Sequence, residues 1–177
     1  EELEQIMKVV ESAQYYVDDI KKGERTKKAP LPFTTSTLQQ EASKVLNFAT
    51  QKTMRIAQQL YEGIDIKGSG TVGVITYLRT DSTRISAEAD ANAREYIAQN
   101  YGENYVSAVA KKADDGKKIQ DAHEAIRPTD ITRTPATLKD SLTRDQFRLY
   151  QLIWKRFAAS RMNPAKYETT SIKIAAG

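Results

Sequence analysis

The sequence of 177 residues contains no cysteine and only one histidine. Disulfides and thiolate metal sites are therefore excluded, and few nitrogen ligands remain for a metal ion. No Asp-x-Asp pair occurs, so the chain is not expected to form a two-metal centre by itself. The glycine-rich loops that hold phosphates or dinucleotides and the nucleophile elbow of serine hydrolases are missing as well.

Long apolar runs are also missing. No stretch approaches the roughly 18 residues that a membrane-spanning helix needs, and the N-terminus does not resemble a signal peptide. Hydrophobic residues make up 40% of the chain and charged residues 28%, which is typical of a globular protein with a buried core. Together with the absence of cysteine, this composition predicts a protein of the cytoplasm that does not bind membranes.

The net charge of +4 is unevenly distributed along the chain. Residues 1–28 carry six basic and seven acidic side chains, and residues 29–124 carry eleven and twelve. Residues 125–177 carry ten basic and four acidic side chains, so the basic excess lies in the last third. A basic face favours a polyanionic partner, although a solvated surface with a chance imbalance explains the charge equally well.

Two predicted strands bracket a helical middle. Apolar residues at three- and four-residue spacing predict a helix over 2–12, and a change of period predicts a strand over 13–22. The polar stretch Lys21–Lys28 indicates a turn and linker, with a domain boundary near Pro30. A second strand is predicted over 166–174, and we expect the two strands to pair as part of a neighbouring β-rich domain.

The middle of the chain carries the start and stop signals of several helices. Thr37 with Gln40 forms a capping-box pattern, and Ser86 and Thr143 are typical N-cap residues. The expected ends of two helices are Gly63 and Gly102. The expected buried stripes contain Leu38, Ala42, Val45 and Leu46; Met54, Ala57, Leu60 and Tyr61; Ala89, Ala93, Tyr96, Ile97 and Tyr101; and Phe147, Tyr150, Ile153, Trp154 and Phe157. A further short helix is predicted over 104–112.

The segment Tyr77–Ser86 carries the first candidate site. It follows the apolar run 72–76, which predicts a buried strand or turn, and it combines a tyrosine with arginines and short hydroxyl side chains. In an extended segment Arg79 would lie on the same face as Tyr77, where its charge would favour the phenolate and bind a phosphate. This combination suits a nucleophile that attacks a phosphodiester. Taken alone, a tyrosine that ends an apolar run is more commonly a core residue.

The segment Asp121–Asp130 carries the second candidate site and the only histidine, His123. On one helical turn His123 and Arg127 would share a face suited to phosphate, and the histidine could move a proton near neutral pH. The alternative is a helix end before Pro128, where Glu124 and Arg127 form an ordinary salt bridge.

The motifs of this chain resemble, in the same order and over essentially its whole length, those of bacterial type IA DNA topoisomerase I. The matching segments are Pro32–Ser43, Thr53–Gly63, Ile75–Ser86, Ala122–Thr129, Leu149–Phe157 and Met162–Tyr167. The stretch around Tyr77 is similar to the active-site segment in which the tyrosine attacks DNA and becomes linked to a 5′ phosphate. The order of these motifs is specific to this family.

The resemblance implies an α+β fold that is predominantly α. Residues 31–163 would form the helical domain with the active-site tyrosine. Residues 1–30 would be the N-terminal helix and strand of a β-rich arch domain, and residues 164–177 its return strand. The implied activity is ATP-independent relaxation of negatively supercoiled DNA, in which one strand is cleaved and rejoined through a 5′-phosphotyrosine.

The same resemblance assigns roles to single residues. Tyr77 matches the nucleophile, and Arg79 matches the arginine that assists at the scissile phosphate. His123 matches a histidine of the DNA-binding active-site surface. The remaining residues expected to contact DNA are Asp81, Ser82 and Arg127.

The resemblance also implies what this chain does not carry. In the family, Mg²⁺ is bound by a Toprim domain upstream of these motifs, and no cofactor is expected in the present chain. Since the chain opens on Glu1 inside an amphipathic pattern, we expect it to be part of a longer protein. The expected partners are single-stranded or underwound DNA and the Toprim-containing remainder, and the chain alone is expected to be monomeric and inactive. The alternative is a non-catalytic helical module that binds nucleic acid or protein.

Overall fold

The computed structural model describes residues 2–107 and 123–176, and the chain divides into two compact units. Unit 1 contains residues 1–28 and 164–177, and unit 2 contains residues 29–163. Helices make up about 49% of the structure and strands about 23%. The predicted α+β, mainly α class is therefore confirmed.

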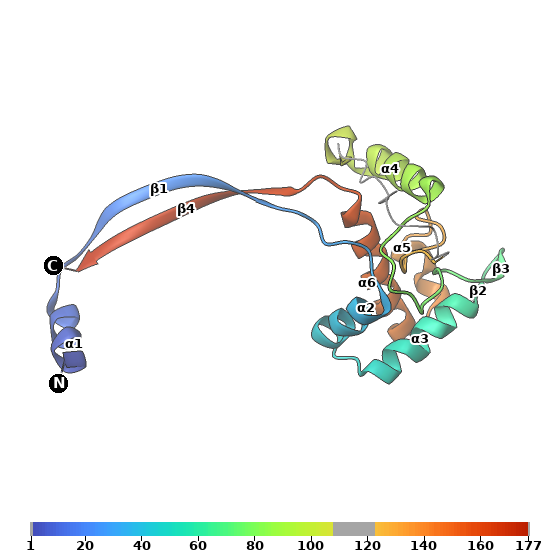
Figure 1. The fold of residues 1–177 in the computed structure, drawn as a ribbon, viewed down its shortest axis with the longest axis horizontal. Coiled ribbons are helices and arrows are strands. Elements are labelled where there is room, and N and C mark those ends of the chain that lie inside the picture. The colour runs from blue at the N-terminus through green and yellow to red at the C-terminus, as the bar shows by residue number, and fades with distance from the viewer. Residues whose placement is uncertain (1, 108–122, 177) are drawn as a thin grey trace. The chain divides into compact units, whose positions relative to one another are not determined.

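Unit 1 is an antiparallel ribbon preceded by a helix (Figure 1). It contains α1 (Glu2–Ser12), β1 (Tyr15–Lys27) and β4 (Ala165–Ala176). The strands pair from Tyr15 with Ala176 to Lys27 with Ala165, which confirms the predicted pairing. None of the described residues of unit 1 is buried, so the hydrophobic core of the described chain lies in unit 2.

The linker predicted over Lys21–Lys28 is wrong, because β1 continues through this polar stretch to Lys27. β4 is nearly as long as β1 and offers a backbone partner at each of these positions. The side chains of the stretch are all exposed. A ribbon without a buried face therefore accepts polar residues that would end a strand in a packed sheet.

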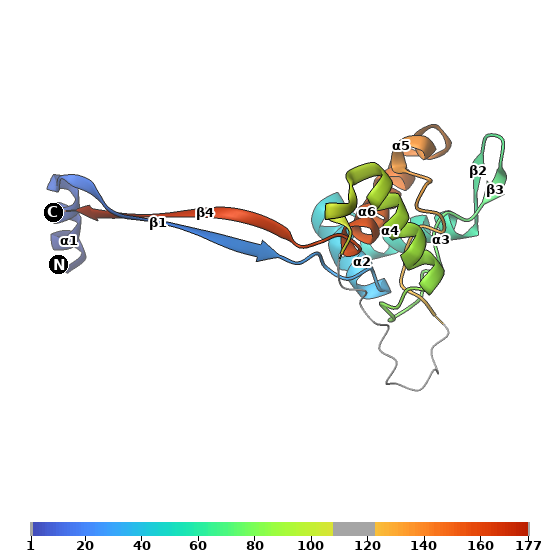
Figure 2. The same ribbon diagram turned by 90° about the horizontal axis from the view of Figure 1, so that it is seen from above.

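Unit 2 is built mainly from helices (Figures 1 and 2). Its elements are α2 (Thr35–Glu41), the π-helix η1 (Ala42–Leu46), α3 (Thr50–Glu62), β2 (Ile64–Ile66), β3 (Gly70–Val72), α4 (Ala87–Tyr101), the 3₁₀ turn η2 (Glu103–Tyr105), α5 (Pro135–Leu138), the 3₁₀ turn η3 (Lys139–Ser141) and α6 (Arg144–Ser160). β2 and β3 form a short hairpin that extends from the end of α3. α6 contacts α3, α5 and η1, and it buries Leu149, Tyr150, Ile153 and Phe157 in the core.

Hydrogen bonds tie α6 to the loop before α5. The indole Nε1 of Trp154 donates to the carbonyl oxygen of Ile131 at 2.9 Å, and the Tyr150 hydroxyl donates to that of Arg133 at 2.6 Å. Burial raises the pKa of Tyr150 far above its usual value, so this hydroxyl stays protonated. Both aromatic side chains therefore satisfy their polar atoms inside the core.

Most of the predicted helix boundaries are confirmed. The structure places caps or stops at Ser86, Thr143, Gly63 and Gly102. α2 begins three residues earlier than predicted, with Thr34 as its N-cap and Thr37 as the reciprocal partner. The Thr37 hydroxyl accepts the N–H of Thr34 at 2.9 Å, so threonine takes the place that glutamate or glutamine holds in the usual capping box.

Three residues assigned to buried stripes are instead exposed, Val45 at 54%, Tyr101 at 46% and Tyr61 at 39%. Val45 lies in η1, where the wider π turn departs from the period of 3.6 residues. Tyr101 ends α4 and packs against Tyr96 and Tyr105. The helix predicted over 104–112 overlaps only η2, and its last five residues lie outside the described residues. No helix in the described part of the chain is long and apolar enough to cross a bilayer.

Candidate active site

The backbone before Tyr77 pairs with a segment that is distant in the sequence, residues 125–129. The N–H of Thr76 donates to the carbonyl oxygen of Arg127 at 2.9 Å, and the N–H of Thr129 donates to that of Val74 at 3.0 Å. An isolated bridge between Ile75 and Pro128 lies between these bonds. Because proline has no N–H, the pairing stays short, and no regular strand forms over 73–77.

The same segment of residues 125–129 also joins the chain just before α2. The N–H of Ile126 donates to the carbonyl oxygen of Phe33 at 2.8 Å. Phe33, Ile75 and Ile126 are all buried at 1% exposure or less. Three segments that are far apart in sequence therefore meet here and fix the residues that follow them.

Tyr77 projects from this junction with 39% of its surface exposed. Its ring centroid lies 5.5 Å from that of Tyr61 in an edge contact, and 5.5 Å from that of His123 with the rings tilted by 34°. Within the described residues, the Tyr77 hydroxyl has no hydrogen-bond partner. The core residue Tyr150 differs in both respects, since it is fully buried and its hydroxyl donates to a carbonyl.

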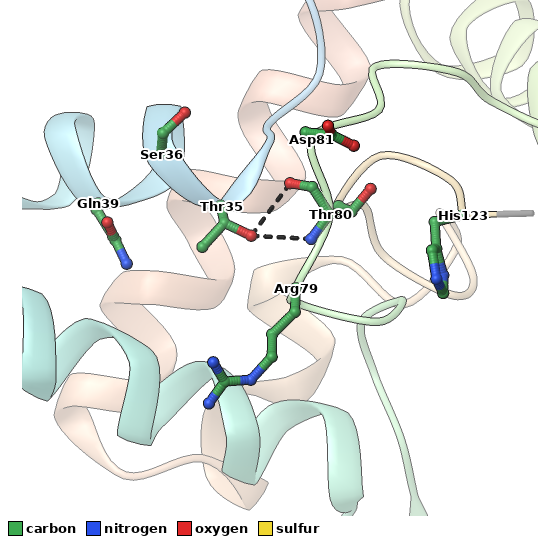
Figure 3. Close-up of a pocket in the computed structure, with 7 residues that line it drawn as sticks. All are labelled: Thr35, Ser36, Gln39, Arg79, Thr80, Asp81 and His123. Atoms are coloured by element: carbon green, nitrogen blue, oxygen red, sulfur yellow. Dashed lines mark hydrogen bonds between the residues drawn. The ribbon is translucent and has the colours of Figure 1, made fainter. Parts of the chain in front are cut away.

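Arg79 follows Tyr77 but does not continue an extended segment. Leu78 and Arg79 lie in a bend, and the Leu78 side chain is buried. The predicted sharing of one face by Tyr77 and Arg79 assumed a strand that the structure does not contain. Arg79 instead lines an open pocket of about 460 Å³ beside α2 (Figure 3).

The pocket collects polar side chains from three parts of the sequence. Its lining residues are Thr35, Ser36, Gln39, Arg79, Thr80, Asp81 and His123. His123 therefore lines the pocket and also contacts the Tyr77 ring. The histidine connects the exposed tyrosine to the pocket that holds the arginine.

Arg79 differs from many other arginines of unit 2 in its electrostatic environment. Arg127, Arg156 and Arg161 form ion pairs with Glu124, Glu41 and Asp90. Among the described residues, Arg79 has neither an ion pair nor a hydrogen bond. Asp81 lines the same pocket, but Figure 3 shows the two side chains extending to opposite sides of the loop. The Arg79 guanidinium is thus available to an external anion.

The helical turn predicted for His123 and Arg127 is wrong, because the structure has no helix over 123–130. Arg127 donates to Glu124 at 2.6 and 2.7 Å and to the carbonyl oxygen of Pro128 at 3.0 Å. The salt bridge between Glu124 and Arg127, which was the alternative interpretation of this motif, is therefore present. Arg127 does not line the pocket.

Ser82 also lies outside the pocket lining. Its hydroxyl accepts the N–H of Arg84 at 3.1 Å, and its own N–H donates to the Thr80 hydroxyl at 3.1 Å. These two local bonds shape the turn that leads from the pocket to α4. Of the six predicted site residues, the structure brings Tyr77, Arg79, Asp81 and His123 to this region and gives Ser82 and Arg127 other local partners.

Three lining residues on α2 were not predicted as site residues: Thr35, Ser36 and Gln39. The run of four hydroxyl residues from 34 to 37 was a signal in the sequence, and two of its members, Thr34 and Thr37, serve the helix cap. The other two line the pocket, which only the fold reveals.

The described residues do not form a metal centre. No group of three or more histidine, aspartate or glutamate side chains in this part of the chain could hold an ion. Asp81 and His123 are the only residues of these types that line the pocket. The residues present therefore do not fit a Mg²⁺ site, and we derive no step through a metal.

The chain matches known proteins over its whole length. The family model described as DNA topoisomerase matches residues 1–177. The structure is similar to the full-length topoisomerase I of Thermotoga maritima, with 44% sequence identity and a TM-score of 0.79. This match covers 96% of the present chain and 26% of the Thermotoga chain, so the chain spans about a quarter of that relative. The chain belongs to the family of bacterial type IA DNA topoisomerases.

Proposed function

We propose that this chain supplies the nucleophile of a DNA-cleaving and DNA-rejoining enzyme and that Tyr77 is the nucleophile. The observation that carries the proposal is an exposed tyrosine in ring contact with His123, which itself lines a polar pocket with Arg79. A tyrosine placed for packing would be buried or would use its hydroxyl within the fold, as Tyr150 does. Tyr77 is exposed, and its hydroxyl bonds to none of the described residues, so it differs from a packing tyrosine in both respects.

The proposed reaction is a transesterification. The Tyr77 oxygen attacks a phosphorus atom of the DNA backbone, a Tyr–O–P bond forms, and the bond from phosphorus to the 3′ oxygen breaks. The phenol proton is lost and the leaving 3′ oxygen gains a proton, so the products are a 5′-phosphotyrosine and a 3′ hydroxyl. The reverse reaction rejoins the strand. Because one phosphate ester replaces another, no ATP is needed.

Arg79 and His123 are suited to different parts of this reaction. The guanidinium carries a permanent charge and a fork of donors, so it can hold the non-bridging oxygens of a phosphate in the pocket. His123 lies against the Tyr77 ring, where it orients the phenol and can bind a phosphate oxygen or transfer a proton. Both groups would stabilise negative charge that develops at phosphorus.

In this proposal, the nucleophile and the Mg²⁺ site lie in different segments of a longer polypeptide. Mg²⁺ would be bound by a Toprim segment outside this chain, and the chain alone would not cleave DNA. The substrate would be single-stranded or underwound DNA in the cytoplasm, and the protein would act as a monomer. The Thermotoga relative is about four times as long as the matched region, which leaves room for such a segment.

The test is covalent transfer of DNA to protein. An oligonucleotide with a label at its 3′ end is incubated with the chain, the Toprim segment and Mg²⁺, because cleavage would leave the labelled part on the protein. A labelled band on a denaturing gel is expected only when both protein segments are present. Tyr77→Phe keeps the ring and removes only the hydroxyl, so the expected result is normal DNA binding and no labelled band.

A second candidate function is a non-catalytic nucleic-acid-binding or protein-interaction module. Exposure of Tyr77, together with an Arg79 guanidinium that has no partner among the described residues, favours the catalytic proposal, because a protein without this activity need not keep either feature. DNA binding by the complete protein with no labelled band under any condition would support the module instead.

A further inference from the structure

Thr35, the first residue of α2, holds the backbone on both sides of Arg79. Its hydroxyl donates to the carbonyl oxygen of Leu78 at 2.7 Å and accepts the N–H of Thr80 at 2.9 Å. Its own N–H donates to the carbonyl oxygen of Thr80 at 2.9 Å. We propose that Thr35 is a positioning residue that sets the orientation of Arg79 toward the phosphate. This inference rests on the proposed function of the pocket.

Few other interactions among the described residues restrain the backbone or the side chain of Arg79. The residue lies in a bend, so no helix or strand ladder restrains its backbone, and its exposed side chain has no partner among the described residues. A guanidinium binds a phosphate through paired donors only in a narrow range of orientations. A small rotation of the backbone at Arg79 would move the donors by an ångström or more, which is enough to slow a positioned reaction.

A direct role of the Thr35 hydroxyl on the phosphate is less compatible with its bonds. A hydroxyl group has one hydrogen to donate, and the Thr35 hydrogen is given to the Leu78 carbonyl at 2.7 Å. A longer contact of 3.1 Å to the carbonyl oxygen of Thr80 competes for the same hydrogen. No donor is then left for a phosphate oxygen, so Thr35 acts through Arg79 although it lines the pocket.

The bond pattern predicts a separation of rate from binding. Thr35→Val has nearly the same volume and leaves every charge in place, so the affinity for single-stranded DNA and its salt dependence should stay within about twofold of wild type. The rate of phosphotyrosine formation, measured with the Toprim segment and Mg²⁺ supplied, should fall about 10- to 100-fold. Thr35→Ser keeps the hydroxyl and should restore the rate.

A double-mutant cycle tests whether Thr35 acts through Arg79. If it does, Thr35→Val should slow the reaction strongly in wild type and add less than about twofold in the Arg79→Ala background. Equal and additive losses in both backgrounds would overturn the proposal, and so would a wild-type rate in Thr35→Val. A complete protein that forms no phosphotyrosine at all would instead overturn the proposed function.

Two further measurements separate positioning from a general loss of stability. Thr53→Val removes the hydroxyl of a buried threonine, which among the described residues bonds only to the carbonyl oxygen of Ala49, the N-cap residue of α3, at 3.1 Å, and should leave the rate unchanged. Amide hydrogen exchange of Thr80 in the wild-type protein should show protection, since its N–H donates to Thr35. An unprotected Thr80 amide would overturn the proposal even if Thr35→Val fails to fold.

Discussion

The rings of Tyr77 and His123 lie 5.5 Å apart, although the two residues come from separate motifs of the sequence. The pairing of residues 74–76 with residues 127–129 brings them together. The Thr76 hydroxyl strengthens this junction, because it donates to the carbonyl oxygen of Ala125 at 2.7 Å and accepts the N–H of Arg127 at 3.0 Å. Backbone pairing beside both residues thus brings the two rings into contact.

Tyr61 should restrain the ring of Tyr77. Tyr61 lies in the last turn of α3, and its ring makes an edge contact with the Tyr77 ring at a centroid distance of 5.5 Å. Tyr61→Leu should slow phosphotyrosine formation about fivefold with unchanged DNA affinity, because an edge contact of about 1 kcal/mol is lost. Tyr61→Phe should react like wild type, since it keeps the ring. Tyr101→Leu is the matched control, an exposed tyrosine in a similar edge contact with Tyr96. A slow Tyr101→Leu variant would show that the effect is not specific to the site.

Arg79 and Arg127 should behave differently in a salt titration. Arg79→Ala removes a cation of the pocket that forms no ion pair within residues 2–107 and 123–176, so the slope of log affinity for single-stranded DNA against log salt should fall by about 0.7. Arg127→Ala should leave the slope unchanged and lower the free energy of unfolding by about 1–3 kcal/mol, because it leaves the half-buried Glu124 without its partner. Fluorescence anisotropy and urea unfolding measure the two quantities. A lower slope for Arg127→Ala would place that residue in the DNA surface.

Gly73 should be needed for the close approach of the Tyr77 segment to α3. A Cβ atom at this position would lie 2.5 Å from the carbonyl oxygen of Tyr61, so backbone atoms would have to move. We expect Gly73→Ala to lower the free energy of unfolding by about 1–3 kcal/mol. Ser69→Ala is the control, because Ser69 lies in the exposed turn between β2 and β3. This change should alter the free energy of unfolding by less than about 0.5 kcal/mol. Equal unfolding midpoints of the two variants would contradict the predicted clash.

Asp90 should make the stability of unit 2 depend on acid pH. Burial alone would raise the pKa of this carboxyl, but hydrogen bonds from Arg161 and Arg94 outweigh it, and the pKa is lowered. Since the folded state holds the proton less tightly than the unfolded state, the stabilisation is present above the unfolded pKa of about 3.9 and is lost as the pH falls below it. Asp90→Asn should therefore flatten the decline of unfolding free energy between pH 5 and 2, as measured by urea titration.

The control for that experiment is Asp145→Asn, because the carboxylate of Asp145 forms an exposed pair with Lys52 at 2.7 Å. At neutral pH Asp145→Asn should lower the free energy of unfolding less than Asp90→Asn does. The reason is that Asp90→Asn removes the carboxylate that pairs with the buried Arg161, which has no other ion pair in the described part of the chain. The same pH dependence in wild type and Asp90→Asn would show that the Asp90 cluster does not contribute.

Local patterns in the sequence are enough to predict most of the helix ends and the family. Ser86, Thr143 and Gly63 mark helix ends through bonds within a few residues, so a one-dimensional pattern is enough to predict them. The helical period of α6 likewise predicts which of its residues are buried. Tyr77 could be proposed as the nucleophile because the residues around it form a recognisable motif, although its exposure could not be predicted.

The assembly of the candidate site depends instead on contacts between distant parts of the folded chain. The short pairing at Pro128 replaces the strand expected before Tyr77, and residues 123–130 do not form the helical turn that would place His123 and Arg127 on one face. The bonds of Thr35 to residues 78–80 bring α2 into the pocket. These interactions join residues more than forty positions apart, or depend on a bend with no periodicity, so no local pattern encodes them. They form because the folded chain must find a partner for each buried backbone group.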